Sequence, residues 1–157
     1  MENLQTYKSQ FKTISILLLI IGVATFMRFL PHPPNFTPVL AIGLFAGASI
    51  RHPLLSLIIP LFIMLISDYF IGFHGLWGWV YGSIALSIFI GRFFNMNALF
   101  SSTLFSSLSS SALFFMITNF GVWVHSAQLY PRTVNGLVQC YVAAIPFFTN
   151  TLLSTMI

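Results

Sequence analysis

The chain has 157 residues, of which 57% are hydrophobic and only 5% are charged, and its mean hydropathy is +0.93. About a quarter of the residues in a soluble domain are normally charged, so this composition excludes a soluble globular protein and predicts an integral membrane protein. The formal net charge is +4, but the six cationic residues are spread singly and form no basic stripe, so nucleic acid is not an expected partner.

Long apolar stretches with short polar connections predict an all-α integral membrane protein, a bundle of about six transmembrane helices in one domain. The stretches are continuous, without the alternation of period two that a transmembrane barrel requires. A semipolar loop is expected at 121–136. The expected spans are residues 13–30, 37–50, 53–72, 76–94, 98–120 and 137–157.

The second expected span is unusually short. Its helical part of about fourteen residues would rise only some 21 Å, whereas the hydrocarbon core is roughly 30 Å thick. The sequence therefore leaves open whether this segment crosses the bilayer fully or is re-entrant.

The cations predict the orientation, because cytoplasmic connections are enriched in Lys and Arg. A cytoplasmic N-terminus gives a four-to-two split, which favours a multi-pass protein of the cell (inner) membrane in this orientation. The inner set is Lys8, Lys12, Arg51 and Arg92, and the outer set is Arg28 and Arg132.

Under this topology the residues best suited to chemistry lie on the external side, in 28–35, 68–79 and 119–132. A protein that only held a bundle together would not need this asymmetry, so we expect capture of a small solute from outside. The sequence has no P-loop, no H-E-x-x-H and no G-x-S-x-G motif, so neither an enzyme nor a cofactor is expected.

Asp68 is the only acidic residue after Glu2, and it lies near the end of an expected span. A carboxylate is costly to bury in the bilayer, so we expect it to face the interior, water or a cation, with Arg28 or Arg132 as partner. Two roles stay open: an ion pair that fixes helix register, or direct contact with substrate or a coupled ion.

Three tryptophans, Trp77, Trp79 and Trp123, fall in the external segments. They suit interfacial anchoring, but aromatic walls beside arginines would also suit a flat or anionic organic ligand. The expected substrate-binding residues are Arg28, Asn35, Asp68, His74, Trp77, Trp79, Asn119, Trp123, Tyr130 and Arg132.

The external segments also contain His32, His74 and His125. No two have metal-ligand spacing, and no nearby cysteine or second carboxylate completes a set, so no metal site is expected. Cys140 lies in an apolar stretch, where a small core residue is the expected role.

Small residues form two G-x-x-x-G pairs, Gly43 with Gly47 and Gly78 with Gly82, and the first is extended by alanines at positions 46 and 48. Such pairs let helix backbones approach closely. They predict either helix packing within the chain or docking of another membrane subunit. The complete set is Gly43, Ala46, Gly47, Ala48, Gly78 and Gly82.

Three parts of the sequence resemble an uncharacterised bacterial family of predicted membrane transport proteins. They are RFLPHPPNFTPVLAIGLFAGA at 28–48, SDYFIGFH at 67–74, and TNFGVW with LYPRT at 118–123 and 129–133. More distantly, that family is similar to the substrate-binding S components of energy-coupling-factor (ECF) vitamin transporters. The resemblance implies a six-helix protein that binds a nutrient from outside and works with a membrane coupling subunit and two ATPases.

One feature departs from the S components, which commonly couple through an A-x-x-x-A surface on the first helix. The first span here has only Ala24, so the small residues of the second span would have to serve instead.

We expect a component that binds and takes up a small, vitamin-like solute. The alternatives are an accessory or scaffolding subunit of a larger membrane complex and a self-sufficient secondary carrier.

Overall fold

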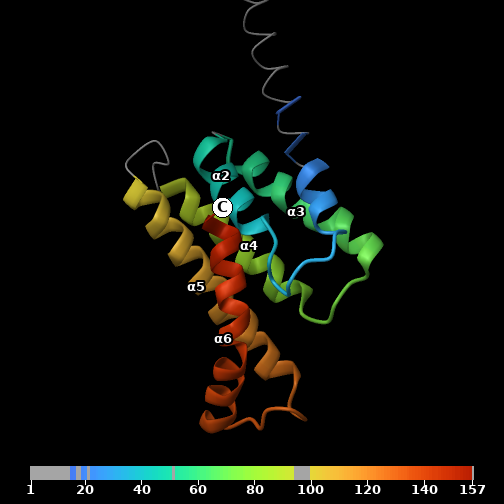
Figure 1. The fold of residues 1–157 in the computed structure, drawn as a ribbon, viewed down its shortest axis with the longest axis vertical. Helices are drawn as coiled ribbons and strands as arrows, with labels where there is room; N and C mark the ends of the chain where they lie inside the picture. The colour runs from blue at the N-terminus through green and yellow to red at the C-terminus, as the bar shows by residue number, and fades with distance from the viewer. Residues whose placement is uncertain (1–14, 17–18, 21, 51, 94–99, 157) are drawn as a thin grey trace, which may run out of the picture.

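The computed structural model describes residues 15–16, 19–20, 22–50, 52–93 and 100–156, and the regular structure in these residues is helical, without strands. The predicted all-α class is therefore confirmed for the part of the chain that the structure describes. After the helical residues at 15–16, 19–20 and 22–27 come five complete helices (Figure 1). They are α2 (Val39–Ser49), α3 (Pro53–Ile71), α4 (Trp77–Phe93), α5 (Phe100–His125) and α6 (Val134–Met156).

Three of these helices, α2, α3 and α4, begin and end within two residues of the predicted boundaries. Local sequence explains both limits of α3. Pro53 suits the first helical position. Gly72 follows the last helical residue with a φ of 106°, a backbone conformation that residues with a side chain rarely adopt. The first span ends in a turn at 28–29, just before the proline cluster. Expected span positions 13–14, 17–18, 21, 94, 98–99 and 157 lie outside the described residues, as do Lys8, Lys12 and Arg51.

The predicted loop at 121–136 is wrong at both ends. The helix α5 continues to His125 and α6 already begins at Val134, so only residues 126–133 connect them. Gly121 lies inside α5, and the indole of Trp79 packs directly on it, where any side chain would overlap the ring. In Figure 1, α5 and α6 lie side by side with this connection at the lower end.

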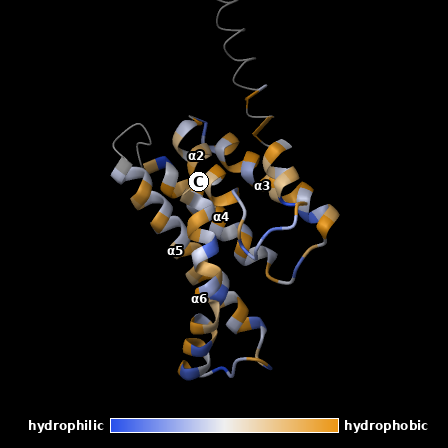
Figure 2. Cartoon of the chain, viewed as in Figure 1, coloured by the Kyte–Doolittle hydropathy of each residue, from blue (hydrophilic) through white to orange (hydrophobic). Residues whose placement is uncertain are grey.

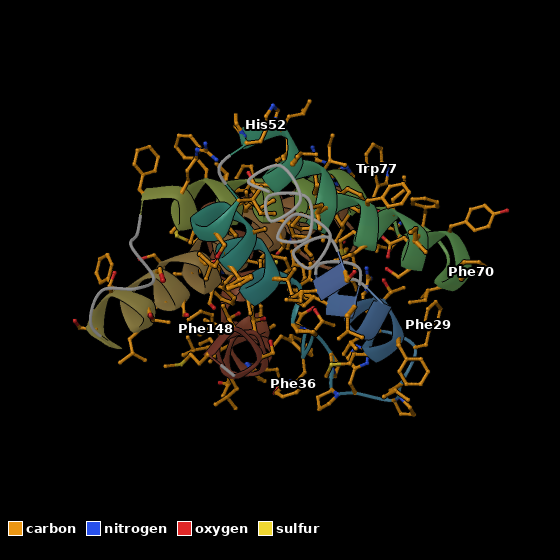
Figure 3. The ribbon with its side chains drawn as sticks, turned by 90° about the horizontal axis from the view of Figure 1, so that it is seen from above. Phe29, Phe36, His52, Phe70, Trp77 and Phe148 are labelled. Carbon is orange, nitrogen blue, oxygen red and sulfur yellow. The ribbon has the colours of Figure 1, made fainter. Side chains whose placement is uncertain are left out.

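The distribution of polar and apolar side chains is the reverse of that in a water-soluble protein. Among the fully buried residues are Ser67, Ser83, Ser87 and Ser110, each with 0% exposure, whereas Phe70 is 70% exposed. Figure 2 shows apolar residues along the helices, and Figure 3 shows Phe70 and Trp77 projecting away from the bundle. Small hydroxyl residues inside and large apolar residues outside are the arrangement that a lipid environment favours.

Three helices are long and apolar enough to cross a membrane, namely α3, α5 from Ser101, and α6. This finding agrees with a location in the membrane. The helix α2 is apolar but has only 11 residues, a rise of roughly 16 Å, so it cannot cross the hydrocarbon core alone.

The closest helix crossing joins α2 to α4 through glycines on both helices. A Cβ atom at Gly47 would overlap the carbonyl of Ile88, and one at Gly91 would overlap the carbonyl of Leu44. The carbonyls belong to helix backbone and cannot move aside as a flexible side chain would. Beside this crossing, Val39, Leu40, Met64, Ile84 and Ile88 form the hydrophobic core cluster.

Candidate functional site

A cavity of about 580 Å³ lies beside the core cluster, and residues from all three polar connections line it. Asn35 comes from the connection before α2, His74 from the connection before α4, and Tyr130 from the connection before α6. Residues that lie far apart in the sequence are therefore brought to one space. Ligand pockets typically have volumes of about 300–1,000 Å³, so the cavity has room for a small organic molecule.

The connection before α2 is held in a defined turn. Phe36 N–H donates to Pro33 O at 3.0 Å, and Asn35 has a φ of 62°. Pro34 and Asn35 thus occupy the positions where a type II turn favours proline and a left-handed residue. Asn150 of α6 donates its side-chain amide to Pro34 O at 3.1 Å and so ties this connection to α6.

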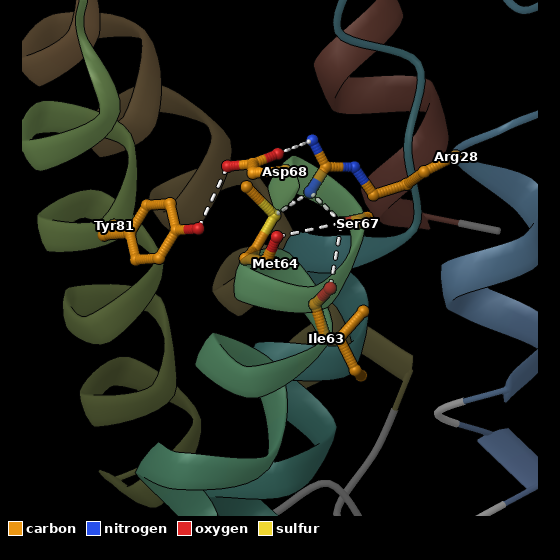
Figure 4. A network of polar contacts seen from close by, with 6 residues as sticks. All are labelled: Arg28, Ile63, Met64, Ser67, Asp68 and Tyr81. Atoms are coloured by element: carbon orange, nitrogen blue, oxygen red, sulfur yellow. Dashed lines mark hydrogen bonds and ion pairs between the residues drawn. The ribbon is translucent and has the colours of Figure 1, made fainter. Parts of the chain in front are cut away.

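Arg28, which lines the cavity, forms an ion pair with Asp68 behind it (Figure 4). Arg28 Nη2 donates to Asp68 Oδ1 at 2.7 Å, and Nη1 donates to Ser67 Oγ at 2.7 Å and to Met64 Sδ. The Asp68 side chain is only 1% exposed, whereas that of Arg28 is 13% exposed and borders the cavity. The carboxylate therefore lies behind the guanidinium as seen from the cavity.

Tyr81 of α4 completes this network. Its hydroxyl donates to Asp68 Oδ2 at 3.0 Å, so each carboxylate oxygen has a donor. Ser67 in turn donates to the backbone of α3, to Ile63 O at 2.8 Å and Met64 O at 2.9 Å. A buried charge is tolerated when it is paired and hydrogen-bonded, and this network meets both conditions while it connects the first helix to α3 and α4.

The lining combines polar and apolar surface. The polar contribution comes from Arg28 and from other hydrogen-bonding side chains, while the apolar contribution comes from all five helices α2 to α6. Such a wall can hold an apolar body and orient a few polar groups, the usual composition of a small-molecule pocket. The polar lining residues are Arg28, His32, Asn35, Thr37, His74, Thr118, Asn119, Tyr130 and Thr151, and the apolar ones include Val39, Leu40, Ile84, Phe114, Ala144 and Phe147.

Five of the ten predicted binding residues line this cavity: Arg28, Asn35, His74, Asn119 and Tyr130. Asp68 does not, but it pairs with Arg28, one of its two expected partners. That pair fixes the position of Arg28, the one side chain with a formal charge among the described lining residues. The sequence alone could not decide whether Asp68 fixes the register of the helices through an ion pair or contacts a ligand directly. The geometry is compatible with both roles.

The other predicted residues lie elsewhere. Trp79 packs edge-on against Phe120 and His125 between α4 and α5, and Trp77 is 55% exposed. Trp123 Nε1 donates to Pro131 O at 3.1 Å, and Arg132 Nη2 donates to Val124 O, so both hold the connection 126–133 against the end of α5. The tryptophans therefore do not wall the cavity, and the second arginine does not face it.

The two glycine pairs differ. Gly43 and Gly47 are buried with Ala46 against the neighbouring helix, which makes them residues of internal packing, and Ala48 is half-buried beside them. At Gly78 and Gly82 no atom of the described residues lies within 4 Å of a Cβ position. Docking of another subunit there stays a prediction.

Several lining residues carried no sequence signal. Cys140 is buried in the wall, where Sγ approaches Asn119 O at 3.4 Å, and Ala144 and Thr151 follow on the same face of α6. Tyr81 was also missed, although its spacing from the sole intramembrane carboxylate offered a weak clue. Within the described ranges, no three His, Cys, Asp or Glu side chains gather closely enough to hold a metal ion.

Comparison with known families gives one result. A family model described as a family of unknown function, DUF6580, matches residues 8–157. The chain belongs to this family. No curated protein and no solved structure matches the chain. The DUF6580 assignment thus covers nearly the whole sequence but brings no activity with it.

Proposed function

We propose that this DUF6580 protein binds a small organic solute in the cavity beside Arg28 and serves as a binding and uptake component of a membrane transporter. The observation that carries the proposal is the lining itself: three polar connections and the helices α2 to α6 contribute to one space of about 580 Å³. Residues needed only for packing would fill such a space, since cavities reduce stability.

Membrane embedding supports the uptake role. The exposed apolar surface suits lipid, and we propose a bundle of about six helices in the inner membrane with a cytoplasmic N-terminus. In this arrangement the connections bearing Asn35, His74 and Tyr130 face outward, so the cavity would take its solute from outside. The tie from Asn150 to Pro34 would hold the first connection over the cavity, and its release would admit the solute.

The proposed mode of action is that of an S component. The small size of the chain, its helical fold and a cavity beside the connection after the first helix are compatible with that role. Such a protein needs energy from other subunits, so a membrane coupling subunit and ATPases are proposed partners, and a vitamin-like nutrient is the proposed class of solute.

The test is thermal unfolding of the purified protein in detergent, with a panel of vitamins and related metabolites. A ligand that binds only the folded state raises the unfolding temperature, and the stabilisation grows with the logarithm of the ligand concentration relative to Kd. We expect at least one compound to raise it reproducibly. No shift with any compound would contradict binding. Solute flux into liposomes that contain this chain alone would instead favour a self-sufficient carrier.

A second candidate function is that of an accessory subunit, and the open face at Gly78 and Gly82 favours it. A groove lined by Gly78, Trp79, Gly82, Ala85, Leu86, Phe89 and Ile117 runs along that face. Gentle purification distinguishes the two functions. Copurification with an ATPase pair supports transport, whereas copurification with an enzyme complex supports the accessory role.

A further inference from the structure

The charges at the cavity are already balanced within the protein. Arg28 is the only lining residue in the described part of the chain with a formal charge at neutral pH, and Asp68 neutralises it at 2.7 Å. The pair therefore has no net charge.

No second charge in the described residues is available to balance a charged ligand. Arg132, which the sequence placed beside an anionic ligand, donates to Val124 O at the end of α5 and does not line the cavity. Arg92 is exposed near the end of α4, where it reaches Ile50 O at 3.4 Å. The titratable groups that face Asp68 are Arg28 from the first segment and Tyr81 from α4.

The geometry points to a cavity that selects ligands without net charge. This inference rests on the proposed binding function and argues against the anionic ligand that the sequence left open. An anion beside Arg28 would compete with a carboxylate that is 1% exposed and would leave an excess negative charge in an apolar wall. Burying an unbalanced charge is costly, and an isolated cation would have no free carboxylate to meet.

Neutral hydrogen-bonding groups suit the lining better. Asn35, Asn119 and Tyr130 offer amide and hydroxyl groups, and Arg28 has more N–H groups than its three bonds use. An amide, urea or hydroxyl group on a mainly apolar body would meet these partners, while Phe114, Ala144 and Phe147 would contact the body.

The inference is tested with matched probes in three series, built on an indole, a phenyl and a hexyl body. Each body carries a primary amide, a carboxylate or an ammonium group of similar size. Binding to the full-length protein in detergent is measured as a shift in unfolding temperature at pH 8, where imidazole groups carry little charge. In each series whose body fits the cavity, we expect the amide probe to bind at least about tenfold more tightly than the carboxylate or the ammonium probe with the same body.

An isosteric variant tests the cause. Asp68→Asn leaves the charge of Arg28 unbalanced, so the carboxylate probe should gain about tenfold or more in affinity and match or exceed the amide probe. Arg132→Gln removes a cation outside the cavity and should leave the ranking unchanged. If Asp68→Asn does not fold, the ranking of the three forms in the wild-type protein still decides the question.

The outcomes separate this inference from the binding proposal. Tighter binding of carboxylate or ammonium probes by the wild-type protein would overturn the selection of neutral ligands but would support a binding cavity. An unchanged ranking in folded Asp68→Asn would overturn the role of the ion pair. No shift with any probe in any series would count against the cavity and this inference together.

Discussion

The helix pair α2 and α4 meets two different environments along its length. At one end Gly47 and Gly91 bring the backbones into direct contact, and nothing larger than a hydrogen atom fits. At the other end Val39, Leu40 and Ile84 border a space of about 580 Å³. The same two helices thus form a closed crossing and an open wall. Close backbone packing fixes their relative position at one end, and the cavity lies between them and their neighbours at the other end.

Gly47→Leu should have the largest effect on stability, because the new side chain must overlap the carbonyl of Ile88. We expect a loss of about 3 kcal/mol or more in the free energy of unfolding, measured by denaturing-detergent titration. Gly82→Leu is the matched control on the open face and should change stability little. Equal losses at both glycines would contradict a closed crossing confined to one face.

At the open end, Arg28→Gln should cost about 3 kcal/mol, because it leaves the carboxylate of Asp68 buried without its cation. Asp68→Asn should cost about half as much, because the remaining guanidinium borders the cavity and water can reach it. The same titration measures both. A larger loss for Asp68→Asn than for Arg28→Gln would show that the more exposed partner is not the arginine.

Tyr81→Phe should have a smaller effect. It removes one hydrogen bond to a charged acceptor, the 3.0 Å contact with Asp68 Oδ2, for an expected loss of about 1.5 kcal/mol. Tyr69→Phe on α3 is the control, since Tyr69 is 75% exposed. Equal unfolding free energies for the two variants would contradict a stabilising hydrogen bond from Tyr81 to Asp68.

Filling the cavity should have the smallest effect on stability and the largest on binding. Ala144→Phe places a ring in open space, so we expect a change within about 1 kcal/mol and loss of ligand-induced stabilisation. Val138→Phe, at a position of α6 that is 52% exposed and outside the cavity, should retain it. If a ligand still stabilises Ala144→Phe, the ligand binds somewhere other than this cavity.

The helices were largely predictable from the sequence. The apolar run that begins at Pro53 and ends before Gly72 predicts α3 nearly to the residue. Proline suits the first position of a helix, and a glycine with positive φ suits the position after its end, in lipid as in water. The end of α5 was not predictable. The sequence after Asn119 resembles a loop, yet residues 121–125 belong to α5. Gly121 packs against the indole of Trp79 from α4, and the local sequence does not show this contact with another helix.

The site was predictable where the chemistry left few choices. A single intramembrane carboxylate with two candidate arginines made the pairing of Asp68 with Arg28 one of two options. The direction of the tryptophans depended on helix rotation, which an apolar sequence with no clear polar face does not specify. Residues such as Ala144 line the cavity because of their position, and their side chains have no chemistry that a sequence could signal.

Native mass spectrometry of the gently purified protein tests the central claim most directly. We predict a bound small molecule of discrete mass on the wild-type chain, retained by Val138→Phe and absent from Ala144→Phe. A chain that never carries such a mass, even after incubation with every stabilising compound of the panel, would contradict it, and so would an Ala144→Phe variant that carries the same mass.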